Sequence, residues 1–136
     1  MIQLQVLVDA DNVAPVRVIP VLEILAALDV APRMVVSGRQ QALDALDWPD
    51  FAELIADAGW QRADLVLANA YEPSNDPLLL ITGDGDFGLL AARHAGQVLV
   101  VSGAPSGRLR DVGVVVDPAV EGTDPIRAWL TAVGVT

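Results

Sequence analysis

Cysteine and lysine are both absent from the sequence, and the single histidine is His94. Without cysteine, the chain has no disulfide framework, no thiol nucleophile and no thiolate metal site. His94 stands just before Gly96, late in an expected helix, so we interpret it as a helix-end cation or surface residue rather than a general base. Arginine supplies every basic side chain.

Long apolar runs are also missing, although 53% of the residues are hydrophobic. A membrane-spanning helix needs about 18 or more consecutive apolar residues, and the longest stretches here are far shorter. The first residues carry no positive charge and lead directly into a strand-like segment, so no secretory signal is predicted. We therefore expect a cytoplasmic protein without a membrane, in which the apolar excess forms the core of a parallel sheet covered on both faces.

The net charge of −10 sets a limit on nucleic-acid binding. It argues against a broad basic face that grips phosphates directly. It does not exclude a nuclease, because carboxylates can hold divalent cations that bridge to phosphate. Substrate binding is then expected to be metal-assisted and salt-sensitive.

Short apolar segments typical of strands alternate with helical patterns along the chain. This order predicts an α/β three-layer domain over residues 1–136, with a central parallel sheet of about five strands flanked by helices. Residues 43–60 are expected to be irregular and then helical over 50–58, which makes Asp57 part of a solvated helical face. The predicted strands are Leu4–Val8, Met34–Ser37, Leu78–Thr82, Val98–Ser102 and Val114–Val116, and the main predicted helices are Pro15–Leu28, Ala63–Tyr71, Phe87–Ala95, Arg108–Val112 and Asp124–Ala132.

Acidic residues follow two of these strands directly. Asp9 comes after the first strand, with Asp11 and Asn12 beside it, and Asp84 and Asp86 follow the strand that begins at Leu78. Asp and Asn at such positions are also common turn formers and helix caps. One cap per helix is sufficient, however, and two acid clusters at strand ends favour a site for Mg²⁺ or Mn²⁺, which prefer oxygen ligands.

The residues around these acids resemble a known family. Val6-Leu7-Val8-Asp9-Ala10-Asp11-Asn12-Val13 is similar to the opening motif of NYN domains, which are PIN-like nucleases, and Leu80-Ile81-Thr82-Gly83-Asp84-Gly85-Asp86-Phe87 is similar to their second signature. The segment Ala63-Asp64-Leu65-Val66-Leu67 resembles the family helix that adds another acid. The resemblance implies a PIN-like fold and a metal-dependent ribonuclease, with Asp9, Asp64, Asp84 and Asp86 as catalytic metal ligands.

Four further residues are candidates for substrate binding. The resemblance implies that Asn12 orients ligands or substrate, and Arg39 follows the second strand, where it is a candidate for binding phosphate. Ser106 and Arg108 belong to a loop that either contacts phosphate or simply connects a strand to a helix capped by Ser106. Single-stranded RNA is the expected substrate, because the resemblance implies RNA and splayed strands fit a narrow acidic crevice.

Three other functions remain open. A haloacid-dehalogenase-like phosphatase shares the first Asp-x-Asp motif and would use Ser37, but these enzymes need a lysine that this chain does not have. A PIN-like module without strong catalysis would bind metal, nucleotide or a protein partner. The small number of candidate acidic ligands and the negative net charge favour it. A dinucleotide-binding fold is disfavoured, since Gly83-Asp84-Gly85 lacks the third glycine of that fingerprint. The apolar excess also allows a homodimer.

Overall fold

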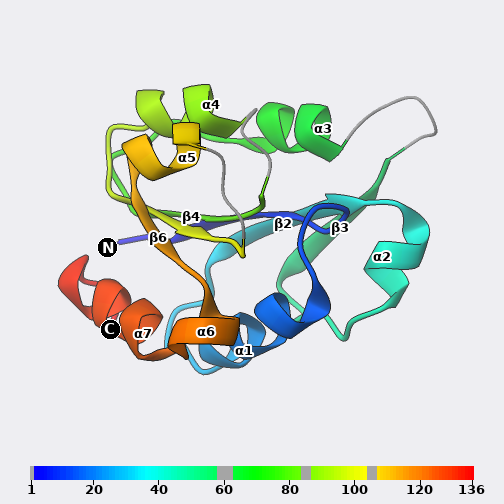
Figure 1. Cartoon of the computed structure of the whole chain (residues 1–136), viewed down its shortest axis with the longest axis horizontal. Helices are drawn as coiled ribbons and strands as arrows, with labels where there is room; N and C mark the ends of the chain where they lie inside the picture. The colour runs from blue at the N-terminus through cyan, green and yellow to red at the C-terminus, as the bar shows by residue number, and fades with distance from the viewer. Residues whose placement is uncertain (1, 58–62, 84–86, 104–106) are drawn as a thin grey trace.

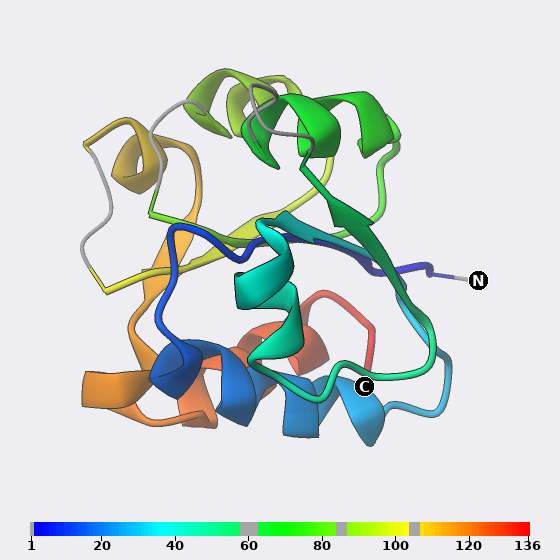
Figure 2. The same cartoon turned by 90° about the vertical axis from the view of Figure 1, so that its right-hand side faces the viewer.

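The chain forms a six-stranded, all-parallel sheet with helices on both faces. The structure is a computed structural model that describes residues 2–57, 63–83, 87–103 and 107–136. Figures 1 and 2 show the three layers, with the sheet in the middle. The strand order is β3-β2-β1-β4-β5-β6. The strands are β1 (Gln5–Asp9), β2 (Arg33–Gly38), β3 (Ala52–Ala56), β4 (Leu78–Ile81), β5 (Val98–Val101) and β6 (Val114–Val116).

The helices divide between the two faces of the sheet. In Figures 1 and 2, α3, α4 and α5 lie on one face, and α1, α6 and α7 lie on the other. Helix α2 contributes the buried Leu43 to the same core as α1 and α7. The helices are α1 (Pro15–Ala26), α2 (Gln40–Asp44), α3 (Ala63–Ala70), α4 (Gly88–Arg93), α5 (Gly107–Val112), α6 (Pro118–Glu121) and α7 (Asp124–Ala132).

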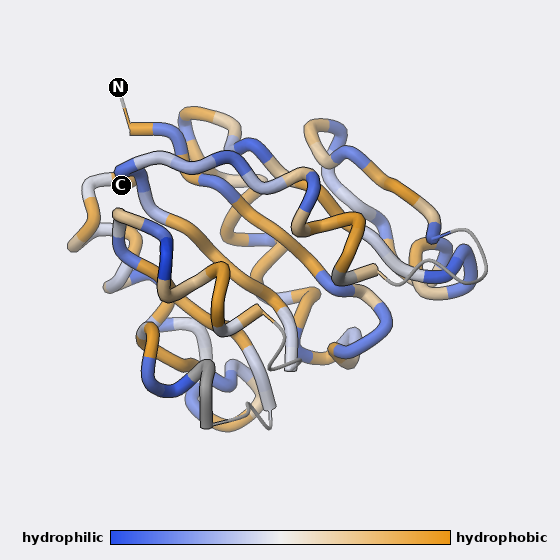
Figure 3. Tube along the Cα trace, turned by 90° about the horizontal axis from the view of Figure 1, so that it is seen from above, coloured by the Kyte–Doolittle hydropathy of each residue, from blue (hydrophilic) through white to orange (hydrophobic). Residues whose placement is uncertain are grey.

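Two hydrophobic cores follow from the alternation of side chains along each strand. In β1, Val6 and Val8 pack into the core beneath α1 and α7, whereas Leu7 packs into the core beneath α3 and α4. Every residue of β1, β4 and β5 is buried, while the edge strands β3 and β6 are partly exposed. Figure 3 shows this composition as hydrophobic strands joined by more hydrophilic connections. Strands covered on both faces explain the high apolar content of the sequence.

The strands are added to one side of β1 first and then to its other side. From β1 the chain builds outward through β2 to β3, then returns to pair β4 with the other side of β1 and continues through β5 to β6. We call the place between β1 and β4 the switch point, and we call the sheet edge where the strands end the carboxyl edge. In open α/β sheets, ligands bind at the carboxyl edge near such a point.

The predicted fold class is confirmed, but two details were wrong. The sheet has six strands rather than five, and the expected helix over 50–58 is the edge strand β3, Ala52–Ala56. Phe51, Leu54 and Ile55 have the spacing of a helical face, yet the segment pairs in register with β2, as in Val36↔Leu54. Tertiary pairing overrides local spacing in so short a segment.

Helix α1 contains two prolines, one at its start and one in its interior. The helix begins at Pro15, where a missing N–H has no cost, and it continues through Pro20. Pro20 cannot donate to the carbonyl four residues earlier, so it interrupts the hydrogen-bond ladder inside the helix. Val18, Val21 and Leu25 are nevertheless buried against the sheet, and this packing holds the helix in place.

His94 stands at the C-terminal end of α4, as expected, but it belongs to a buried hydrogen-bonded pair and is not a surface residue. The residue is 7% exposed, and Nε2 lies 2.6 Å from the carbonyl oxygen of Asp76. A carbonyl only accepts, so Nε2 donates, and Nδ1 lies 2.8 Å from the Tyr71 hydroxyl. Burial raises the pKa of Tyr71, so its hydroxyl stays protonated at neutral pH.

Among the described residues, no helix is long and apolar enough to cross a membrane.

Candidate active site

Four small polar side chains form a transverse row at the carboxyl edge. Ser37 and Asp9 are register partners on β2 and β1, and Thr82 and Ser102 directly follow the paired strands β4 and β5. All four are buried, with exposed fractions between 0% and 2%. Their positions continue the alternation that points Leu7 toward α3 and α4, so the row lies on that face. We call these residues the polar row; it crosses the switch point.

Asp9 is the acidic member of the polar row. Its Oδ2 accepts a hydrogen bond of 2.6 Å from Asn12 Nδ2 and one of 3.3 Å from Thr82 Oγ1. Both donors are neutral, and the residue is fully buried. Taking a carboxylate out of water is costly unless hydrogen bonds or opposite charge compensate for it. Asn12 and Thr82 therefore fix the orientation of Asp9 from two different strand ends.

Two acidic residues, Asp11 and Asp57, form a pair at the ends of β1 and β3. The side chain of Asp57 is hydrogen-bonded to Asp11, and the backbone N–H of Arg39 donates to Asp11 Oδ1 at 2.9 Å. Partial burial raises the pKa of Asp57, the hydrogen bond and the negative charge of Asp11 raise it further, and the Arg39 guanidinium opposes the shift. The backbone N–H of Asp57 also donates to the Gly38 carbonyl at 3.0 Å, which anchors Asp57 at the carboxyl edge.

An arginine clamp lies at the ends of β5 and β6. Arg17 Nε and Nη2 donate to the two carboxylate oxygens of Asp117 at 3.0 and 3.3 Å. Asp117 Oδ1 also accepts from the Ala119 N–H, so the same carboxylate caps α6. The guanidinium packs so closely on Gly103 that an added Cβ would lie 2.2 Å from its atoms. Arg17 thus joins α1 to the carboxyl edge in a fixed orientation.

The structure brings three of the predicted site residues to one edge. Asp9, Asn12 and Arg39 all lie at the ends of β1 and β2. The backbone of Asp64 lies in the first turn of α3, which follows β3 and so starts near the same edge, and the backbone of Arg108 lies in α5; their side chains are outside the description. Asp84, Asp86 and Ser106 lie outside the described residues.

The chemistry of the donors at this edge fits a hard divalent cation. The side chains of Asp9, Asp11 and Asp57 offer carboxylate oxygens, and Asn12 and Thr82 offer neutral oxygens. Oxygen ligands of this kind suit Mg²⁺ and Mn²⁺. Within the described part of the chain, however, no three acidic or histidine side chains are gathered closely enough to hold a metal ion.

Sequence reasoning missed two contributors to this edge. Asp57 was assigned to a solvated helical face, but it follows an edge strand and pairs with Asp11. Thr82 was treated as the end of an apolar strand, but its hydroxyl donates to Asp9. The available signal was shared by four segments: a run of Val, Leu and Ile that ends in one Ser, Thr or Asp. That residue has a common position relative to the pleat, which becomes visible once the strands are aligned.

The chain matches no protein-family model, and a comparison with curated proteins gives no match.

Proposed function

We propose that the chain is a metal-dependent ribonuclease that hydrolyses phosphodiester bonds in single-stranded RNA, with Mg²⁺ or Mn²⁺ held at the carboxyl edge. Asp9, Asp64, Asp84 and Asp86 are the proposed ligands. Asn12, Arg39, Ser106 and Arg108 are the proposed contacts to ligands or substrate. The resemblance of the two aspartate motifs to NYN domains is the sequence argument for this assignment.

One observation carries the proposal. A fully buried carboxylate, Asp9, lies in the polar row beside the switch point, where ligands bind in sheets of this kind. Strand β4 runs parallel to β1 with Val8 opposite Ile81, so the chain leaves β4 next to Asp9 just before Asp84 and Asp86. The two acid clusters therefore follow neighbouring strand ends, as a shared metal site requires.

The chain's own residues have separable tasks in this reaction. Asn12 and Thr82 hold Asp9 in one orientation, and a fixed ligand geometry is worth about 10- to 100-fold in activity at metal sites. Arg39 supplies positive charge beside Asp11 and Asp57, where it can attract a phosphate that the −10 chain would otherwise repel. When bound, the divalent cation supplies charge neutralisation at the phosphoryl oxygens and a lower pKa for water.

The direct test is cleavage of end-labelled single-stranded RNA with Mn²⁺, Mg²⁺ or EDTA, comparing wild type with Asp84→Asn. Wild type should cleave only with metal, and Asp84→Asn should lose roughly 100-fold or more in rate. Asp124→Asn, which removes the same charge from the start of α7, is the matched control and should keep the wild-type rate. A folded wild type that cleaves neither RNA nor DNA contradicts the proposed activity.

A second candidate is a PIN-like module that binds metal, nucleotide or a protein partner without strong catalysis. It is favoured by the net charge of −10, which opposes the binding of a nucleic acid that turnover would need. Both candidates bind metal, so turnover alone separates them. A haloacid-dehalogenase-like phosphatase is less well supported, because the Ser37 hydroxyl is buried and donates to the Ile55 carbonyl at 2.8 Å.

A further inference from the structure

A pocket lies on the outer side of α1, between this helix and the segment Ala45–Pro49 that leads into β3. Its volume is about 420 Å³, which is within the range of roughly 300–1,000 Å³ for small-molecule pockets. We call it the α1 groove. Helix α1 belongs to the layer with α6 and α7, whereas the polar row faces the layer of α3 and α4. The α1 groove is therefore separate from the proposed active site.

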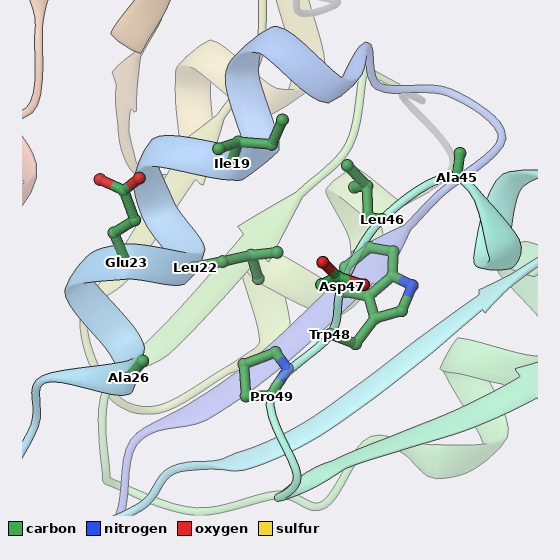
Figure 4. A pocket seen from close by; sticks show the side chains of 9 residues that line it. All are labelled: Ile19, Leu22, Glu23, Ala26, Ala45, Leu46, Asp47, Trp48 and Pro49. Carbon is green, nitrogen blue, oxygen red and sulfur yellow. The ribbon is translucent and has the colours of Figure 1, made fainter.

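The walls of the α1 groove are mainly apolar. Leu22 and Ile19 come from α1, and Trp48 and Pro49 come from the opposite segment. Figure 4 shows Leu22 directed from α1 toward the Trp48 ring. The indole N–H of Trp48 donates to the Leu43 carbonyl at 2.7 Å, so the ring is held in place rather than free to fill the groove. Ile19 is 45% exposed although it lies on a helix that packs against the core.

The charge around the α1 groove has one sign. Glu23 and Asp47 are among its lining residues, and none of the nine described lining residues is basic. In Figure 4, Asp47 lies beside the Trp48 indole, and Glu23 lies at the outer rim on α1. The chain as a whole carries a charge of −10, so the long-range field adds to the local one. A complementary ligand has an apolar body and a positive charge.

We propose that the α1 groove binds a small organic cation, whose apolar part lies against Leu22 and Trp48 and whose positive charge lies beside Asp47, while Glu23 adds to the negative field from the α1 side. An aromatic or aliphatic ammonium compound has this chemistry. Burial of the apolar part supplies affinity, and the two carboxylates supply selectivity for charge. A second copy of the chain fits less well, since a symmetric contact would bring the same carboxylates together.

The test uses 3-phenylpropylammonium as the probe, with its uncharged analogue 3-phenylpropan-1-ol and the anion 3-phenylpropanoate as comparisons. Binding is followed by amide and indole N–H shifts in two-dimensional NMR spectra of the full chain. The ammonium compound should bind with a Kd on the order of 1 mM, as expected for a ligand of this size. The alcohol should bind about tenfold more weakly, and the anion should shift no groove signals.

Matched variants separate the local charge from the overall charge. The double variant Glu23→Gln/Asp47→Asn should bind ammonium and alcohol equally. The control Asp29→Asn/Glu53→Gln removes two exposed carboxylates that do not line the groove, and it should keep the tenfold preference. Equal binding of ammonium and alcohol by wild type would overturn the proposal, as would shifts that map elsewhere. Groove shifts that depend on protein concentration without ligand would overturn it in favour of a second copy.

Discussion

Asp9 is the most deeply buried acidic residue described at the carboxyl edge. It is fully buried, and its Oδ2 accepts from an amide and a hydroxyl that are both neutral. Charged hydrogen bonds of this kind offset part of the desolvation cost. The burial of Asp9 beside the switch point is the reason for placing the proposed metal here rather than among the exposed acids of residues 44–50.

Asp57 provides a prediction at the scale of one residue. Its pKa is raised from the ordinary value of 3.8, because burial and Asp11 disfavour the charged form. The folded protein therefore holds this proton more tightly than the unfolded chain, and ionised Asp57 lowers stability at neutral pH. Asp57→Asn keeps the shape and removes the charge, so it should stabilise the protein at pH 7 by about 1 kcal/mol or less.

The change in the free energy of unfolding caused by Asp57→Asn should depend on pH. The stabilisation by Asp57→Asn should shrink as pH falls through the raised pKa and should vanish below about 3.8, where both states of wild type are protonated. Urea unfolding at several pH values in metal-free buffer measures it. Glu53→Gln, an exposed change on the same strand, is the control and should leave the pH profile unchanged. Destabilisation by Asp57→Asn at pH 7 would show that the charge is compensated in the folded protein.

At the scale of elements, the strands buried on both faces were predicted, and so was the partly exposed edge strand β6, whereas the other edge strand, β3, was missed. The apolar runs of β1, β4 and β5 identified them without ambiguity, because strands covered on two sides need no polar alternation. Strand β3 lies at the edge and alternates irregularly between exposed and partly buried residues, so its apolar spacing resembled a helix. That one error also misplaced Asp57, since a strand end and a helix face put the same carboxylate in different surroundings.

The short helix α6 was not predicted either, because its formation depends on a distant contact. Asp117 caps α6 and is itself held by Arg17, 100 residues earlier in the chain. Local propensity cannot encode such a partner. The contact also explains the glycine at position 103, whose hydrogen atom faces the guanidinium.

Gly103→Ala tests this clamp between α1, β5 and α6. A Cβ there would lie 2.2 Å from the Arg17 guanidinium, so the ion pair with Asp117 must shift or break. Gly103 does not have a positive φ, so alanine fits the backbone itself. The expected loss in the free energy of unfolding is about 1–2 kcal/mol, measured by urea unfolding.

Gly83→Ala is the matched control for the clamp. It also follows a central strand, and its added Cβ would meet atoms only at 3.4 Å or more. Its stability should change by less than about 0.5 kcal/mol, since alanine restricts the unfolded chain slightly. If both variants lose stability equally, the loss belongs to strand-end glycines in general and the clamp contributes nothing measurable.

At the scale of the whole molecule, the strand order places the proposed active site at the switch point between β1 and β4. The order β3-β2-β1-β4-β5-β6 is that of dinucleotide-binding folds, but the turn after β1 contains Asp9, Asp11 and Asn12 where those folds need glycines. In the proposed site, the acidic turn would change what this end of the sheet attracts from a pyrophosphate to a cation. The sequence was sufficient to predict the three layers and the position of Asp9 at a strand end, but the polar row became visible only with the strand register.

The measurement that tests the central claim most directly is the position at which a divalent cation binds. Substoichiometric Mn²⁺ is added to the ¹⁵N-labelled chain, and paramagnetic broadening of each amide signal is recorded for wild type and Asp9→Asn. We predict selective broadening at residues 9–12, Thr82, Gly83 and Asp57, and its loss in a folded Asp9→Asn protein. Broadening spread over the exposed acids, or centred at the edge but unchanged by Asp9→Asn, would contradict a metal site at the switch point.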